Sequence, residues 1–89
     1  MRRSPDFLLR EVADTRVIVP VGPATAKYPG MINVNETGAF IWQLLETEQT
    51  VDSLAQALER EYEVRLEQAR EDVQRFIQKL IPTGAILES

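Results

Sequence analysis

The fold is decided by one stretch of the chain, residues 31–45, which reads MINVNETGAFIWQLL. Residues 31–34 predict a short strand that passes directly into a helix. Asn35 is a suitable N-cap for that helix, because its side-chain oxygen can accept a hydrogen bond from the first turn. Glu36 then stands in the first turn, where the helix dipole favours a carboxylate.

A hydrophobic staple also marks the entry into this helix. Val34 and Ala39 occupy the two staple positions, which fix the angle at which the strand meets the helix. The helix that follows carries large apolar side chains on nearly every side: Phe40, Ile41, Trp42, Leu44 and Leu45. We therefore expect it at the centre of a small domain, with Trp42 in the core rather than in a ligand platform.

Two further strands are predicted before this stretch. Residues 7–13 form the first, and residues 16–21 form the second, which is rich in β-branched side chains. Pro20 has no N–H, so its end of the strand should lie at an edge or a bulge. Residues 24–28 fit either a loop or a short strand. The close spacing predicts an antiparallel meander, and residues 1–6 are expected to form a flexible tail.

Two more helices are predicted after residues 36–46. The second helix begins after Thr50, and helical spacing places one set of apolar residues on a single face: Val51, Leu54, Ala55, Leu58 and Tyr62. The third begins near Leu66 and should end before Pro82, since the residue preceding a proline is pushed out of the helical region. Residues 86–87 are expected to fold back on the core.

Together these elements predict an α+β fold of three short antiparallel strands followed by three helices. The last two helices could form a helix-turn-helix pair, as in a winged helix. At 89 residues the chain fits one domain, which we place at residues 7–89.

Composition limits the classes of function. The chain has no cysteine and no histidine, so the commonest metal ligands and the commonest general base are missing. We expect no enzymatic activity, no cofactor and no metal. The formal net charge of -4 argues against nonspecific nucleic-acid binding. No signal peptide or apolar run of about 20 residues is present, so we expect a cytoplasmic protein without membrane contact.

The central stretch resembles the PqqD-like family, the stand-alone leader-recognition domains, or peptide chaperones, of ribosomal peptide natural product biosynthesis. The similar pattern runs from Val34 through Asn35-Glu36-Thr37-Gly38 to Trp42, followed by Leu44-Leu45. It continues in a second group of positions: Thr50, Val51, Leu58, Tyr62, Glu63, Val64, Ala69, Asp72, Val73, Phe76, Ile77 and Gly84. The resemblance implies a winged-helix-like, non-enzymatic domain. Its partners would be a precursor leader peptide and a modifying enzyme, such as a radical S-adenosylmethionine protein or a leader peptidase.

In this family the leader adds as a strand between the third strand and the third helix. At helical spacing, Ala69, Val73 and Leu80 form the core seam of that helix together with Phe76. Ile77 and Ile81 lie to one side of the seam, and the opposite flank is polar: Gln68, Asp72, Arg75 and Lys79. The peptide-binding residues that we predict are Tyr28, Met31, Ile32, Asn33, Val34, Arg70, Gln74, Ile77 and Ile81.

Several of these residues also fit a structural role. Ile77 and Ile81 could simply broaden the core, and Met31, on the strand face opposite Ile32, could lie at its rim. Arg70 could clamp an acidic leader residue or pair with Glu67 on its own helix.

Two alternatives concern the whole chain. A winged-helix DNA-binding protein is the second hypothesis, although the charges of its third helix nearly cancel. An exposed strand edge can also pair with a second copy of the chain, as in a homodimer.

Overall fold

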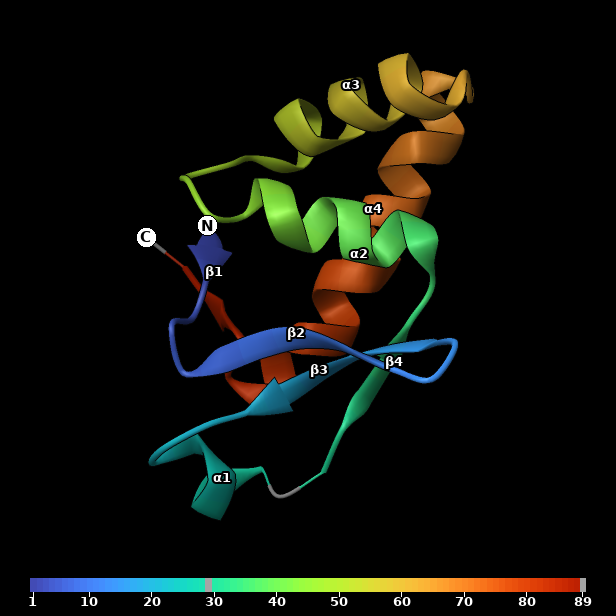
Figure 1. Ribbon diagram of the computed structural model, residues 1–89. Coiled ribbons are helices and arrows are strands. Elements are labelled where there is room, and N and C mark those ends of the chain that lie inside the picture. Colours follow the sequence, from blue (N-terminus) through green and yellow to red (C-terminus); the bar gives the residue numbers. More distant parts are fainter. Residues whose placement is uncertain (29, 89) are drawn as a thin grey trace.

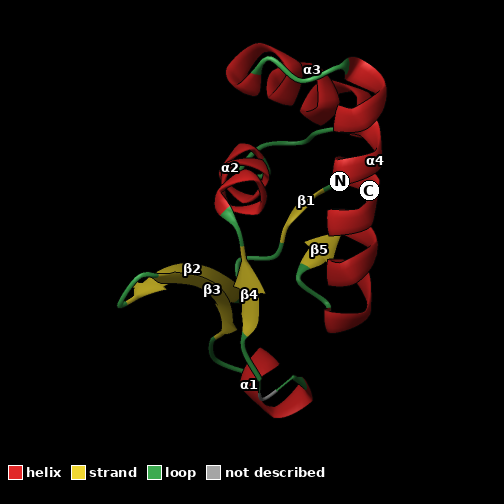
Figure 2. Cartoon of the chain, turned by 90° about the vertical axis from the view of Figure 1, so that its right-hand side faces the viewer, coloured by secondary structure: helices red, strands yellow, loops and turns green. Residues whose placement is uncertain are grey.

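A three-stranded antiparallel sheet and a group of helices make up the computed structural model, which describes residues 1–28 and 30–88 (Figure 1). The strands follow the order β2-β3-β4, with β3 in the middle. Figure 2 shows this sheet on one side of the molecule and the long helix α4 on the other. The predicted α+β class and the antiparallel meander are confirmed, whereas the winged-helix resemblance is not.

Strands β2 (Phe7–Val12) and β3 (Thr15–Pro20) form a tight hairpin. Val12 pairs with Thr15, so Ala13 and Asp14 alone make the turn. Ala13 has a φ of 55°, because a two-residue hairpin turn needs a positive φ to match the twist of its strands.

Strand β4 (Ile32–Val34) pairs with β3 on one side only. The segment before it contains a single helical turn, α1 (Ala24–Lys27), instead of the loop or short strand predicted for residues 24–28. Pro23 has a φ of -61° and suits the start of a helix. The Tyr28 amide closes the turn by donating to the Ala24 carbonyl at 2.8 Å.

The three predicted helices are present as α2 (Glu36–Leu44), α3 (Val51–Tyr62) and α4 (Leu66–Leu80). A short 3₁₀ turn, Ile81–Thr83, follows α4 and contains Pro82. Asn35 caps α2 as predicted, accepting from the Gly38 amide at 2.8 Å. The chain therefore turns from strand to helix within one residue, which fixes α2 beside β4.

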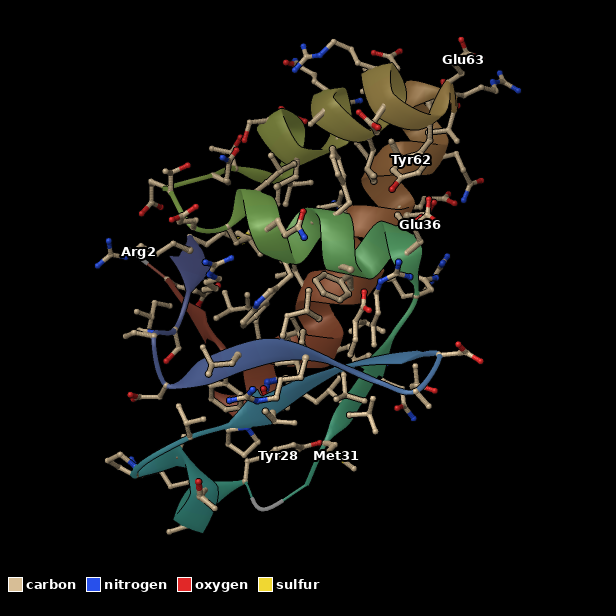
Figure 3. All side chains as sticks on the ribbon, viewed as in Figure 1. Arg2, Tyr28, Met31, Glu36, Tyr62 and Glu63 are labelled. Atoms are coloured by element: carbon tan, nitrogen blue, oxygen red, sulfur yellow. The ribbon has the colours of Figure 1, made fainter. Side chains whose placement is uncertain are left out.

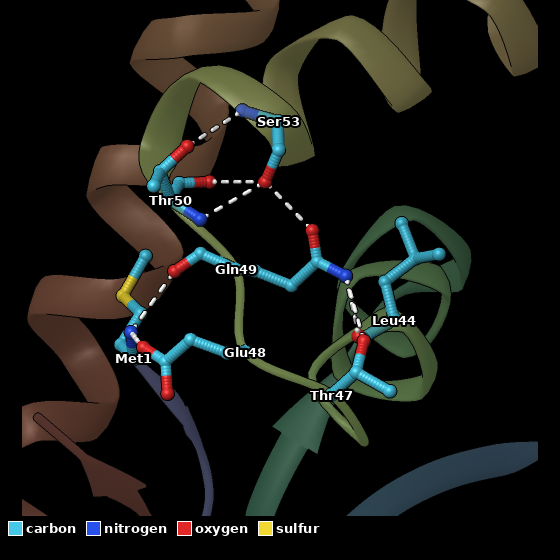
Figure 4. Close-up of polar contacts among 7 residues, drawn as sticks. All are labelled: Met1, Leu44, Thr47, Glu48, Gln49, Thr50 and Ser53. Atoms are coloured by element: carbon cyan, nitrogen blue, oxygen red, sulfur yellow. Dashed lines mark hydrogen bonds and ion pairs between the residues drawn. The ribbon is translucent and has the colours of Figure 1, made fainter. Parts of the chain in front are cut away.

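Thr50 caps α3 through a reciprocal capping box with Ser53 (Figure 4). Gln49 joins this cap to the end of α2, because its side chain donates to the Leu44 carbonyl at 3.0 Å and accepts from Ser53 Oγ at 2.6 Å. The Gln49 backbone also accepts from the amine of Met1. These bonds hold the turn between α2 and α3 in one conformation.

The prediction of a flexible tail at residues 1–6 is wrong. Arg2–Arg3 form a strand, β1, that pairs with β5 (Ile86–Leu87) in a second, two-stranded sheet. The Ser4 amide donates to the Ala85 carbonyl at 2.8 Å, and Ser4 is buried. The predicted return of residues 86–87 to the core is confirmed for Ile86, which is buried, whereas Leu87 is exposed. The two residues supply the strand that pairs with the N-terminal segment.

The core lies between the sheet, α2, α3 and α4. Its largest fully buried side chains are Trp42, Ile18, Ile41, Leu45, Leu54, Leu58, Leu80 and Val73. Trp42 is 2% exposed, so it belongs to the core, as expected. Arg3 covers it from outside, with its guanidinium carbon 5.8 Å from the ring centroid.

Candidate functional site

A groove of about 450 Å³ lies between the free edge of β4 and the side of α4. This volume is in the range of ligand-binding clefts, about 300–1,000 Å³. Three groups of residues line it: Asn33, Val34 and Asn35 from β4 and its end, Thr37, Gly38 and Ile41 from α2, and Asp72, Arg75, Phe76 and Lys79 from α4. An open strand edge and a helix therefore face each other across one cleft.

The orientation of the β4 backbone follows from one contact. Lys79 Nζ donates to the Asn33 carbonyl oxygen at 3.0 Å, so this carbonyl points toward α4 and away from β3. In an antiparallel ladder, neighbouring residues face opposite sides. Asn33 therefore presents its N–H and C=O to the groove, while Ile32 and Val34 bond to β3.

The floor of the groove is formed by a close contact between two helices. A Cβ atom placed on Gly38 would lie 2.9 Å from Phe76 Cε1, closer than real Cβ atoms approach. The absence of a side chain at Gly38 lets the Phe76 ring lie against α2. Because Phe76 is half-buried, part of its ring stays available to the groove.

The α4 side of the groove carries three charged residues. Arg75 donates to Asp72 Oδ1 at 3.3 Å, and Gln68 donates to the same oxygen at 3.0 Å. Asp72 is thus engaged within its own helix. Lys79 reaches across the groove to β4 instead, which leaves a local positive charge on a chain that is acidic overall.

The predicted residues of the strand lie where the alternation places them. Met31 is 65% exposed, whereas Ile32 is 4% exposed and belongs to the core. Asn33 is exposed and Val34 is half-buried, at the groove. Tyr28 packs against the core from the start of this segment.

The α4 residues that line the groove are not the ones that we predict to bind the peptide, because the flank that carries Phe76 and Lys79 faces β4. At about 100° per residue, Gln74 lies roughly 160° around the helix from Phe76. Arg70 pairs with Asp52 of α3 at 2.9 Å, not with Glu67. Ile77 is 5% exposed and belongs to the core, and Ile81 lies beyond α4, in the 3₁₀ turn.

Eight groove residues are not among the predicted binding residues: Asn35, Thr37, Gly38 and Ile41 at the start of α2, and Asp72, Arg75, Phe76 and Lys79 on α4. Their helical spacing was visible, but the polar flank resembled a solvated surface. The signal that could have found them is Phe76, since it stands at the border between the core seam and that flank. An aromatic residue beside a polar flank is consistent with a groove rather than with a plain surface.

A second polar contact lies outside the groove, where Tyr62 at the end of α3 meets Glu36 at the start of α2 (Figure 3). The ring of Tyr62 meets Phe40 edge-on at a centroid distance of 5.5 Å. Burial raises the pKa of the Tyr62 phenol, and the carboxylates of Glu36 and Glu61 raise it further. Tyr62 therefore holds its proton more tightly in the folded protein.

The sequence places this groove in a known protein family. The sequence matches the family described as Coenzyme PQQ synthesis protein D (PqqD) over residues 17–86. The chain belongs to the PqqD family. The match covers β4, all of β3 but its first two residues, and α1 to α4, so the groove lies wholly within the PqqD-family region. No curated protein matches the chain in sequence.

Two solved structures resemble this PqqD-family chain over nearly its whole length. One is described as TbiB1 in complex with the TbiA(beta) leader peptide, with a TM-score of 0.76, 19% identity, and coverage of 100% of this chain and 98% of the other. The other is described as lasso peptide synthetase B1 complexed with the leader peptide. Its TM-score is 0.73 and its identity is 25%, with coverage of 98% of this chain and 96% of the other.

Two absences concern the described residues, 1–28 and 30–88. Within these ranges, no cluster of acidic residues could hold a metal ion. In the same part of the chain, no helix has the length and hydropathy to cross a membrane.

Proposed function

We propose that this PqqD-family chain binds the leader segment of a ribosomally synthesised precursor peptide. The leader adds as a strand to the outer edge of β4, beside α4. The observation that carries this proposal is the outward-facing backbone of Asn33, which lies on the edge of the sheet, beside a groove bounded by α4. The two similar structures, both described as complexes with leader peptides, support it.

The backbone supplies the first part of the affinity. Asn33 offers one backbone donor and one backbone acceptor. Because alternate residues face the same side of a strand, Met31 offers a second donor and acceptor. Each strand hydrogen bond contributes about 0.5–1.5 kcal/mol. Asn35 ends the row, because its carbonyl already accepts from the Ala39 amide at 2.9 Å. The added strand therefore pairs over a short stretch.

Side chains supply the rest of the affinity and the selectivity. The half-buried Phe76 ring and Val34 form an apolar strip along the groove, where each buried leader side chain adds about 1.5–3 kcal/mol. Met31 adapts to varied partners because its side chain is flexible. Ordering a disordered leader costs about 2–5 kcal/mol or more, so a micromolar to submicromolar Kd results, which suits a carrier that releases its cargo.

The role is that of a non-enzymatic carrier. The chain would present the leader to a modifying enzyme, either a radical S-adenosylmethionine protein or a leader peptidase, in the cytoplasm. The free edge of β4 can also accept a second copy of the chain when no peptide is present. Leader binding would then compete with dimer formation, and size-exclusion chromatography with and without peptide measures this.

DNA binding is less well supported as the second hypothesis. Of the basic residues on α4, Arg70 pairs with Asp52 and Arg75 pairs with Asp72. A helix that enters a phosphate-lined groove needs free positive charge. A gel shift with duplex DNA at low and at physiological salt tests this hypothesis directly.

The experiment that tests leader binding is calorimetric titration with the leader of the precursor peptide encoded beside the gene of this chain. We expect a Kd in the micromolar range or below, and no binding by the same peptide in scrambled order. A Kd weaker than about 100 μM, which corresponds to less than ~5.5 kcal/mol, would contradict the proposed function.

A further inference from the structure

The side chain of Lys79 spans the groove that the proposed function assigns to the peptide. It leaves α4, crosses the gap and places Nζ 3.0 Å from the carbonyl oxygen of Asn33 on β4. That oxygen is the acceptor that an added strand needs. The butyl chain of Lys79 therefore lies in the path of the incoming backbone, and the ammonium occupies its hydrogen-bonding site.

Lys79 has no carboxylate partner in the described part of the chain. The ion pairs there join Glu48 to the Met1 amine, Arg16 to Glu11, Arg70 to Asp52 and Arg75 to Asp72. Asp72, the acidic residue of the groove, already accepts from Arg75 and Gln68. It also lies seven residues from Lys79, about 10 Å along the helix.

We infer that Lys79 is a latch on the free strand edge, and that an acidic side chain of the peptide releases it. This inference rests on the proposed function. When a strand adds to Asn33, the ammonium must leave the carbonyl and find another acceptor. A peptide carboxylate that passes α4 provides one at the groove, whereas a neutral peptide leaves the ammonium to water. The site therefore selects an extended peptide with an acidic residue at one fixed position.

A direct contact between Lys79 and one peptide carboxylate fits the charges of this chain better than a general attraction of acidic peptides. The whole chain carries a net charge of -4, which repels acidic peptides at long range. At physiological salt such repulsion is screened beyond about 8 Å. A contact between Lys79 and a carboxylate acts below that distance. The preference for acid should therefore appear at one peptide position, not as a preference for total negative charge.

The test is selection from a display library of random twelve-residue peptides on the wild type and on Lys79→Met. Methionine keeps the length of the side chain and removes the charge, and Lys79 is exposed, so the fold should persist. Lys27→Met is the matched control, because Lys27 is the other lysine of the sequence and lies on α1. Unchanged thermal midpoints verify that all three proteins are folded.

We expect the wild type and Lys27→Met to enrich peptides with Asp or Glu at one position, and Lys79→Met to lose that enrichment. In the selected peptide, Glu→Gln should weaken binding to the wild type about three- to tenfold, as for a partly buried ion pair. The same change should alter binding to Lys79→Met less than twofold. Lys79→Met should bind the neutral peptide at least as tightly as the wild type does, because the latch is gone.

A second readout follows the latch itself. With [6-¹³C]lysine the protein gives two Cε signals, one for each lysine, and Lys27→Met assigns them. The Lys79 signal should shift on addition of the acidic peptide, and the Lys27 signal should not.

The outcomes separate the latch from the function on which it rests. Enriched peptides without a fixed acidic position, or with the same acidic position on Lys79→Met, would overturn the latch and leave peptide binding intact. If no peptide is enriched on any of the three proteins, the proposed function fails, and the latch fails with it.

Discussion

Gly38 of α2 and Phe76 of α4 lie so close that a methyl group at position 38 would meet Phe76 Cε1 at 2.9 Å. This contact brings α4 to the start of α2, directly beside the end of β4. Glycine inside a helix costs about 1 kcal/mol relative to alanine. The close approach of the ring is the structural reason for this residue, and it sets the position of the groove floor.

Substituting Gly38→Ala should therefore affect peptide binding more than stability. The gain in helix propensity, about 1 kcal/mol, offsets part of the clash. The Phe76 ring can also shift, because the atom that the new methyl group meets belongs to a side chain and not to the backbone. We expect the free energy of unfolding to change by less than about 1.5 kcal/mol. The displaced ring narrows the groove, so leader affinity should fall by at least about tenfold by calorimetry.

The double variant Gly38→Ala, Phe76→Leu is the matched control for this prediction. Leucine removes the ring atoms that the new methyl group meets, so the two substitutions should be strongly non-additive in stability. Additive effects would show that Gly38 and Phe76 are not coupled, and that the contact does not shape the groove.

The end of α3 offers a gain in stability at Glu63. Its φ of 53° places it in the left-handed region, where glycine is the usual residue because it has no Cβ. Glu63→Gly should raise the free energy of unfolding by about 0.5–1 kcal/mol. Glu59→Gly, at an exposed position inside α3, should lower it by a similar amount. Urea denaturation measures both, and a loss of stability in Glu63→Gly would contradict this account.

Stability should fall at high pH because of Tyr62. Its pKa is raised in the folded protein, by burial first and by Glu36 next, so the folded state holds the phenol proton more tightly than the unfolded state. The resulting stability is fully present below about pH 10, the ordinary tyrosine pKa. It is lost as the pH rises through the raised value.

Two substitutions test this assignment through the free energy of unfolding between pH 9 and 11. Tyr62→Phe should flatten the alkaline decline, since phenylalanine cannot ionise. Glu36→Gln should flatten it in part, because one of the causes of the raised pKa is removed. If the loss of stability at high pH is the same in both variants as in the wild type, it comes from the titration of other groups.

The cap of α3 should contribute measurably to stability. Thr50 accepts from the Ser53 amide at 3.0 Å, and the Thr50 amide donates to Ser53 Oγ at 2.9 Å. Thr50→Ala should cost about 1 kcal/mol of unfolding free energy, and Thr50→Ser should cost much less, because serine keeps the oxygen. Equal losses in the two variants would show that the methyl group, not the cap, stabilises this turn.

Local signals in the sequence were enough to predict most of the fold. The Asn35 cap, the Thr50 cap and the stop before Pro82 are each set by residues within one turn of the boundary. The alternation that separates Met31 from Ile32 is equally local, and burial agrees with it. Such features depend only on residues that are close in the sequence, so they can be predicted from a single sequence.

Features that depend on distant residues could not be predicted in the same way. Arg2–Arg3 form a strand only because Ile86–Leu87 lie beside them, and two residues carry no strand pattern of their own. The flank of α4 that lines the groove also differs from the one that we predict to bind the peptide. Ile77 is apolar because it packs in the core, while the groove uses the flank of Lys79.

The central claim is that a peptide pairs with the outer edge of β4 at Asn33. Hydrogen exchange of the Asn33 backbone amide, followed by NMR with and without the leader peptide, tests this most directly. Exchange of this amide should slow by at least about tenfold in the complex, because its N–H gains a partner and leaves water. If the leader binds and the Asn33 amide exchanges at the same rate as in the free protein, strand addition at β4 is contradicted.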